Sequence, residues 1–298
     1  MQREAPGNRA VCGRERDGNQ AGGDGEGVRV SLVLSLFPGI GMLDHAFERE
    51  GFCVVRGPDV IWGGDVRTFH PPAGVFDGII GGDPCQSHSA LANLVRAKGL
   101  EPSFPDMTPD YQRVVEEARP AWFLRENTPK APDIKPAGYD VRSFLLDNST
   151  LDSGDGWGHE QMRRRKFWFG TRDCDAPELR QWIDFALFEL PETRCPVGCS
   201  GNLTPGQRTR IRQQAVSSDT RSVPVALGGG GHPKSTLDTD PNKRRTLEEM
   251  LRLQGFPEDW MSHQPWTMQA KRKMVGNGVA LPTGRALAQA IRAWNAEQ

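Results

Sequence analysis

The stretch VRVSLVLSLFPGIGMLDHAFEREGF, residues 28 to 52, decides the fold. It opens with an apolar run of strand length, turns at Gly39 and Gly41, and continues with apolar residues at helical spacing at Leu43, Ala46 and Phe47. The pattern predicts a strand, a glycine turn and a helix. Glycines at such a turn let the backbone amides at the start of a helix approach a ligand closely.

The same alternation continues outward from this stretch. Short apolar runs at residues 52–55, 75–80 and 121–124 predict strands, and residues 111–118 and 284–294 predict helices. Short strands that are apolar throughout are typical of a parallel sheet buried on both faces. We therefore expect an α/β fold in which helices cover both sides of a mostly parallel sheet.

Composition divides the chain into three parts. Residues 1–27 have almost no large apolar side chain and are expected to form a disordered tail. Residues 28–170 together with 268–298 carry the periodic segments and predict the catalytic domain. Residues 171–267 are rich in Pro, Gly, Arg and Ser over much of their length, which predicts a second, smaller, loop-rich lobe.

Bulk properties restrict the class of protein. With 37% hydrophobic and 25% charged residues, the 298-residue chain is typical of a globular enzyme, and no apolar run reaches the roughly 20 residues of a membrane span. The charged N-terminus and six scattered cysteines favour a cytoplasmic protein, which we expect to be a monomer. A net charge of −1 argues against nonspecific coating of nucleic acid, although basic residues gather in the second half. No metal site is predicted, because the spacing of Cys195 and Cys199 is atypical of zinc.

The sharpest chemical signal is Gly81-Gly-Asp-Pro84-Cys85-Gln86, which directly follows the apolar run FDGII. Ligands bind at the carboxyl ends of strands in such sheets, so Cys85 is expected beside a ligand. A lone cysteine is more often a buried structural residue, but glycine and proline before Cys85 and polar residues after it favour a reactive loop. The neighbouring Asp83 is expected to raise the pKa of the Cys85 thiol.

A carboxyl group is predicted beside this cysteine, because Glu126 ends the next strand. Such a pair suits cytosine, whose carbon 5 becomes nucleophilic only after something adds to carbon 6. Cys85 would add to carbon 6, and Glu126 would hydrogen-bond the ring nitrogen.

Two further acids predict a cofactor. Asp59 follows the second strand, and Asp65 and Val66 are expected where a third strand ends. A carboxylate there can accept hydrogen bonds from ribose hydroxyls, which favours an adenosine-bearing cofactor without a pyrophosphate. Because Asp65 lies only six positions after Asp59, the helix usual between such strands is expected to be missing or reduced.

The ordered motifs resemble those of the bacterial and phage DNA (cytosine-5)-methyltransferases. The resemblance covers roughly residues 30–170 and 244–291, and six segments carry it: Phe37 to Gly41, Pro84 to Gln86, Glu126 to Thr128, Gln161 with Arg163 and Arg165, Arg245 to Pro257, and Gly276 to Val279. The chain departs from the family at Met42, which replaces a third glycine, and at His88 and Thr128.

The resemblance implies a Rossmann-like sheet and methyl transfer from S-adenosylmethionine to carbon 5 of a flipped cytosine in double-stranded DNA, read by residues 171–243. The implied catalytic residues are Cys85, Glu126, Arg163 and Arg165. The implied cofactor-binding residues are Phe37, Gly39, Gly41, Asp59, Asp65, Val66, Pro84, Asn277 and Val279. Two alternatives remain open, an RNA cytosine-5 methyltransferase and an inactive DNA-binding regulator. Restriction-modification is one expected setting.

Overall fold

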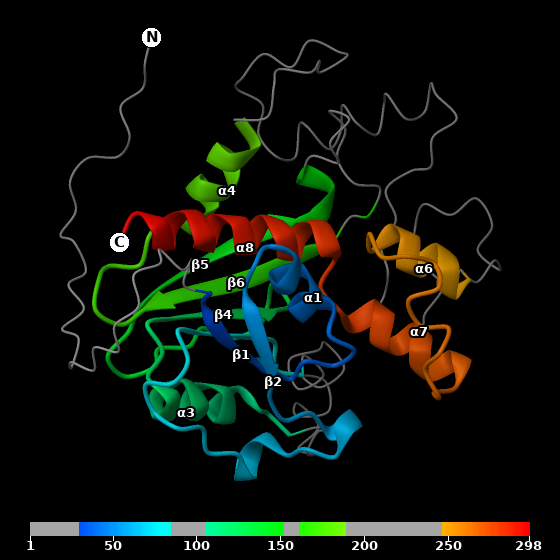
Figure 1. The fold of residues 1–298 in the computed structure, drawn as a ribbon, viewed down its shortest axis with the longest axis horizontal. Coiled ribbons are helices and arrows are strands. Elements are labelled where there is room, and N and C mark those ends of the chain that lie inside the picture. Colours follow the sequence, from blue (N-terminus) through cyan, green and yellow to red (C-terminus); the bar gives the residue numbers. More distant parts are fainter. Residues whose placement is uncertain (1–29, 85–104, 152–160, 162, 189–245) are drawn as a thin grey trace, which may run out of the picture.

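The computed structural model describes residues 30–84, 105–151, 161, 163–188 and 246–298. Its centre is a six-stranded sheet with the order β2-β1-β3-β4-β6-β5 (Figure 1). The strands are β1 (Leu32–Leu36), β2 (Cys53–Arg56), β3 (Gly78–Gly81), β4 (Trp122–Asn127), β5 (Asp140–Asp147) and β6 (Arg164–Thr171). Strands β2, β1, β3 and β4 are parallel, whereas β6 runs antiparallel to both β4 and β5.

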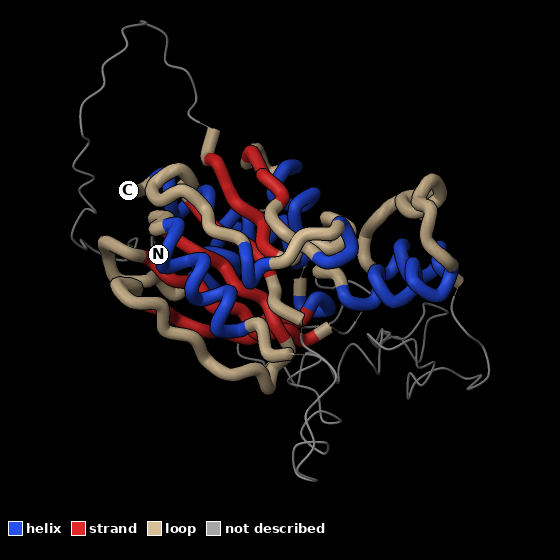
Figure 2. Tube along the Cα trace, turned by 90° about the horizontal axis from the view of Figure 1, so that it is seen from below, coloured by secondary structure: helices blue, strands red, loops and turns tan. Residues whose placement is uncertain are grey.

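Helices cover both faces of this sheet. Helices α1 (Met42–Arg49), α4 (Leu179–Phe188) and α8 (Leu281–Ala296) lie on one face, and α3 (Thr108–Ala118) lies on the other (Figure 1). Helices α6 (Leu247–Leu253) and α7 (Met268–Asn277) lie to one side of the sheet, as Figures 1 and 2 both show. The short 3₁₀ helices are η1 (Val60–Trp62), η2 (Val66–Thr68) and η4 (Asn148–Thr150). None of the helices described is long and apolar enough to cross a membrane.

The sheet is buried on both faces because successive strand residues pack into different cores. In β4, Trp122 and Leu124 belong to the core that faces α1, α4 and α8, whereas Phe123 belongs to the core that faces α3. This two-sided burial explains why the strands are apolar at consecutive positions. The final helix packs onto the same core through Leu287 and Ile291.

The topology places a ligand-binding edge at the end of β1. Strand β1 lies between β2 and β3. The chain therefore passes from β1 to β2 on one side, and then returns past β1 to form β3 on its other side. In open α/β sheets, ligands bind outside the carboxyl ends of the strands at such a switch point. The Rossmann-like α/β class expected from the sequence is thereby confirmed.

One expectation about the sheet is wrong. No strand ends at Asp65 and Val66, because the short connection after β2 forms η1 and η2 instead, with Asp59 and Asp65 capping them. The helix expected to be reduced there is replaced by these single turns. The mostly parallel sheet expected from the sequence is confirmed, because among the described strands β6 alone runs against the others.

The division into three parts stays a prediction, because residues 1–29 and 189–245 lie outside the described ranges. Within the described part, Leu179 and Ile183 of α4 pack into the core of the main sheet, although the expected boundary assigns them to the second lobe.

Candidate active site

The end of β4 and the start of β6 bring two of the expected catalytic residues into contact. Glu126, at the end of β4, forms an ion pair with Arg165 of β6, with 2.9 Å between its Oε1 and the arginine Nε. Their side chains are 13% and 20% exposed, respectively. The antiparallel register of β4 and β6 sets Glu126 opposite Phe167, so Arg165 is its diagonal neighbour on the same face.

The pKa of Glu126 is raised, as is typical of a carboxyl group that donates or shares a proton. Burial raises the pKa of its carboxyl group above the ordinary value, while Arg165 and then Arg163 lower it. Gly82 leaves room for this carboxyl group, because a β-carbon there would lie 2.8 Å from Glu126 Oε2. A carboxyl group with a raised pKa can share a proton with a bound ring nitrogen.

The neighbouring Arg125 faces the opposite side of the sheet, where it binds Asp83. Arg125 Nε lies 2.5 Å from Asp83 Oδ1, and both side chains are fully buried. We expected Asp83 to act as an isolated negative charge that raises the pKa of the Cys85 thiol. That expectation omitted Arg125, whose guanidinium group compensates the charge. Cys85 itself lies outside the described residues.

Arg125 is a residue that the sequence analysis missed. A charged residue inside the apolar run Trp122-Phe-Leu-Arg125 cannot be buried without a partner, since burial of an unpaired charge is costly. Asp83, at the end of the adjacent strand, was the available partner. The buried arginine could be seen in the sequence, but its partner could be identified only from the pairing of β3 with β4.

Arg163 connects the site to the C-terminal helices. Its side chain is 5% exposed, and its Nη2 donates to the backbone oxygen of Asn277 at 3.1 Å. Its backbone amide donates to Asp147 Oδ1 at 3.0 Å. The charge of Arg163 thus lowers the pKa of Glu126, and its side chain binds the last residue of α7.

The glycine turn after β1 is held by backbone contacts rather than by side-chain pairs. Phe37 has a φ of 53°, and Gly39 and Gly41 have φ values of 57° and 79°. Asp59 accepts the amide of Gly39 at 2.9 Å and that of Ile61 at 3.0 Å. Left-handed φ at the non-glycine Phe37 is strained and persists only where the surroundings fix it.

A buried acid lies under this turn. Ser35 Oγ donates to Asp44 Oδ1 at 2.5 Å, and Arg56 Nε lies 3.1 Å from Asp44 Oδ2. Burial raises the pKa of Asp44 to about 6, although Ser35 and Arg56 partly oppose the effect. Asp44 therefore couples the first turn of α1 to both β1 and β2.

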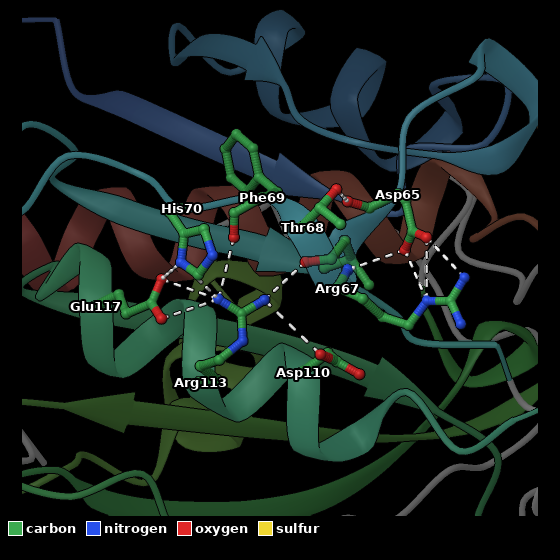
Figure 3. Close-up of polar contacts among 9 residues, drawn as sticks. Asp65, Arg67, Thr68, Phe69, His70, Asp110, Arg113 and Glu117 are labelled. Carbon is green, nitrogen blue, oxygen red and sulfur yellow. Dashed lines mark hydrogen bonds and ion pairs between the residues drawn. The ribbon is translucent and has the colours of Figure 1, made fainter.

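Asp65 and Val66 lie on a loop that α3 holds in place (Figure 3). Arg113 of α3 donates to the backbone oxygens of Val66 at 2.7 Å and Phe69 at 3.1 Å, and it also pairs with Glu117. Asp65 itself binds Arg67, whose hydrogen bond lowers the pKa of the Asp65 carboxyl group. Val66 is buried in the core that faces α3.

The C-terminal motifs meet at the junction of α6, α7 and α8. The buried Gln254 donates from Nε2 to the backbone oxygen of Val275 at 2.7 Å, and its own backbone oxygen accepts the amide of Leu281 at 2.8 Å. Val279 is buried in the main core, whereas Asn277 is exposed. A β-carbon at Gly278 would collide with Met42, so this junction lies directly against the start of α1.

These residues fit an adenosine-bearing methyl donor. A β-carbon at Gly39 would meet no atom within 4 Å, which leaves its backbone approachable. Trp62 is half exposed at 53%, and its Nε1 donates to the Gly39 oxygen at 2.8 Å. An exposed aromatic ring next to a glycine turn offers an apolar surface to a purine, and Asp59 supplies an acceptor. Both oxygens of Asp65 already accept hydrogen bonds from Arg67. Among the described residues, no group of three or more His, Cys, Asp or Glu could hold a metal ion; Cys195 and Cys199 lie outside them.

Together, the α/β sheet and the charged side chains at the carboxyl ends of its strands are typical of an α/β enzyme. The sequence model of the C-5 cytosine-specific DNA methylase family matches residues 63–196 and 202–293. The chain therefore belongs to this family, and it is a DNA (cytosine-5)-methyltransferase by class.

Individual relatives are similar over most of their length. The type II methyltransferase M.FnuDI of Fusobacterium nucleatum is 26% identical, with 87% of this chain and 94% of that protein covered. M.NgoPII of Neisseria gonorrhoeae is also 26% identical, with 87% and 95% covered. Among solved structures, the S. pombe Dnmt2 methyltransferase matches with a TM-score of 0.56 at 13% identity, covering 89% of this chain and 99% of that one. At that identity the structural match shows the shared fold alone.

Proposed function

We propose that this chain transfers a methyl group from S-adenosylmethionine to carbon 5 of cytosine in double-stranded DNA, with Cys85 as covalent nucleophile on a flipped base. The observation that carries the proposal is the Glu126–Arg165 pair at the end of β4, one strand from the segment that leads through Pro84 to Cys85. A carboxyl group and a guanidinium group on one face match the ring nitrogen and carbonyl oxygen of cytosine.

The reaction follows from these groups. The Cys85 sulfur forms a bond to carbon 6, and Glu126 shares its proton with the ring nitrogen, so that the ring electrons move toward carbon 5. Arg165 donates to the carbonyl oxygen and holds Glu126 in place. Carbon 5 then takes the methyl group as the donor's sulfur–methyl bond breaks and leaves a thioether. A base, for which solvent water suffices, removes the carbon 5 proton, and the Cys85–carbon 6 bond breaks to release the thiolate. Bound S-adenosylmethionine supplies an electrophilic methyl group on a sulfonium.

Support for the cofactor assignment is the glycine turn and the loops that contact it. Phe37, Gly39 and Gly41 form the turn, and Asp59 binds the amide of Gly39. The remaining residues assigned to the cofactor are Asp65, Val66, Pro84, Asn277 and Val279. Asp59 already accepts two backbone amides, and each carboxylate oxygen retains a second lone pair for a ribose hydroxyl.

We assign target recognition to residues 171–243, whose arginines at positions 208 and 212 are the expected phosphate contacts. Most of this range lies outside the described residues. The relatives named type II methyltransferases support a role in restriction-modification. We also propose that the protein acts as a monomer in the cytoplasm.

The test is covalent trapping on DNA that contains 5-fluorocytosine. Fluorine at carbon 5 cannot leave as a proton does, so the wild type is expected to remain attached to the duplex. Cys85→Ala is expected to lose both trapping and methyl transfer while still binding S-adenosylmethionine in calorimetry. An active Cys85→Ala protein would contradict the mechanism, and preferential methylation of tRNA over duplex DNA would contradict the substrate.

A further inference from the structure

Asp83 and Arg125 form a buried ion pair behind the proposed catalytic carboxyl group. Arg125 Nε and Nη2 donate to the two oxygens of Asp83 at 2.5 and 2.9 Å, the two-pronged geometry that guanidinium and carboxylate groups prefer. Both side chains are fully buried. Because successive strand residues face opposite sides, this pair lies on the α3 face of β4, and Glu126 lies on the other.

Arg125 is fixed by three further contacts. Its Nη1 donates to the backbone oxygen of Pro132 at 2.9 Å, its Nη2 donates to Thr108 Oγ1 at 3.1 Å, and its Cζ lies 4.5 Å from the centre of the Trp168 ring. The planar group thus binds in several directions at once, which a lysine ammonium cannot reproduce.

Asp83 is fixed to β4 on both sides of Glu126. Its carboxylate binds Arg125, and its backbone oxygen accepts Asn127 Nδ2 at 3.0 Å. Thr108 Oγ1 of α3 donates to its Oδ2 at 3.0 Å. The residues immediately before and after Glu126 therefore both hold Asp83, the residue from which the chain continues through Pro84 to Cys85.

The two charges act on Glu126 in opposite directions. Among the described residues, the charged groups that influence its pKa are Arg165 and Arg163 from the β6 side, Asp83 from the end of β3, and Arg125 from its own strand. Asp83 raises the pKa of Glu126 and Arg125 lowers it. While both are present, their effects on Glu126 partly cancel.

We propose that Asp83 and Arg125 form a charge-balanced brace that positions Glu126 against the Pro84 segment and keeps the negative and positive charge behind it equal. Both are positioning residues, since neither lies on the face of the sheet that carries Glu126 and Arg165. The proposal rests on the proposed function of Glu126. Stability alone does not explain the pair, because well-packed apolar residues often replace a buried ion pair without loss.

The direct test is the titration of Glu126 in the free protein. Protein labelled with 13C at the glutamate carboxyl carbon is titrated by NMR, and Glu126→Gln identifies the Glu126 resonance by its absence. The variants are Asp83→Asn, Arg125→Met and the double variant, with Arg142→Met as control. Arg142 pairs with Glu178 at 2.7 Å on the exposed part of β5, so the control removes an ion pair elsewhere.

The single variants are expected to move the midpoint in opposite directions, each by roughly half a pH unit or more. Asp83→Asn removes a negative charge and lowers the midpoint, whereas Arg125→Met removes a positive charge and raises it. The double variant returns the midpoint toward the wild-type value. Should Arg125→Met fail to fold, Asp83→Asn must still lower the midpoint and the double variant restore it. The proposal is overturned if both single variants shift the Glu126 midpoint in the same direction, or if neither shifts it.

Methyl transfer provides a second readout. The pH profile of single-turnover transfer to duplex DNA is expected to follow the Glu126 midpoint in each variant, while Arg142→Met matches the wild type. If the wild type transfers no methyl group to DNA, the proposed function fails, but the titration still decides on the brace. A shifted titration with an unchanged rate profile refutes the positioning role.

Discussion

The two halves of the site are built differently, although both are formed by the ends of parallel strands. At the ends of β3 and β4, charged side chains hold one another: Arg125 binds Asp83, and Arg165 binds Glu126. At the ends of β1 and β2, the glycine turn itself is held through its backbone, because Asp59 accepts the amide of Gly39, and the Asp44–Arg56 pair lies beneath the turn. The first half therefore depends mainly on paired side chains, and the turn of the second half depends also on backbone conformation.

The largest effect is expected from Glu126→Gln, which removes a proton-sharing group from the first half without changing its size. Methyl transfer should fall by roughly 10² to 10⁴-fold, the usual contribution of a general acid or base. Single-turnover kinetics with labelled donor measure this, and donor affinity should stay unchanged. Glu178→Gln, in the exposed pair with Arg142, is the control. An equal loss of methyl transfer in this control would show that the effect is not specific to Glu126.

Arg125→Met should cost the most stability. Removal of Arg125 takes the two-pronged ion pair from the buried Asp83 carboxylate, and such losses reach about 3–5 kcal/mol in the free energy of unfolding. Urea denaturation measures the change. Arg142→Met, in a pair whose side chains are 40% and 51% exposed, should change it by no more than about 1 kcal/mol. An equal loss of stability in the two variants would show that the burial of an ion pair does not determine the cost of breaking it.

A pH effect is expected from Asp44 in the second half. Its pKa is about 6 in the folded protein and 3.8 by reference, so the folded state binds this proton more tightly. The corresponding stability is fully present below about pH 4 and is lost as the pH rises through 6, by about 3 kcal/mol at most. Asp44→Asn should remove that part of the pH dependence between pH 4 and 7. An unchanged slope would mean that Asp44 titrates normally.

Gly41→Ala tests the backbone half with the smallest expected effect. Its φ of 79° should cost an alanine about 1–2 kcal/mol, and the new β-carbon would lie 2.5 Å from Arg56 Nη2. Gly138, also at 79° but with no atom within 4 Å of such a β-carbon, is the matched control. Calorimetry should show weaker donor binding for Gly41→Ala alone. Equal donor affinity in both variants would contradict a role of Gly41 in donor binding, because the two variants share the same backbone strain.

Much of the fold could be predicted because local pattern determines it. The strand, glycine turn and helix around Gly39 follow from periodicity, and the short gap from Asp59 to Asp65 correctly excluded a full helix. The edge formed by β5 and β6 was missed because charged residues interrupt the apolar pattern of both strands. The Arg125–Asp83 pair was missed for another reason, since residues 42 positions apart meet only through the order of the strands.

The register of β6 has a consequence for sequence change in this protein. Arg165, Phe167 and Phe169 share one face of the strand, while Lys166 and Trp168 share the other, where both contact Asp133. A deletion of one residue within β6 would still place a basic side chain diagonal to Glu126, but the aromatic rings would then face the opposite side of the sheet from their present cores. Evolution can therefore vary this strand by substitution, whereas changes of length belong in the connections on either side.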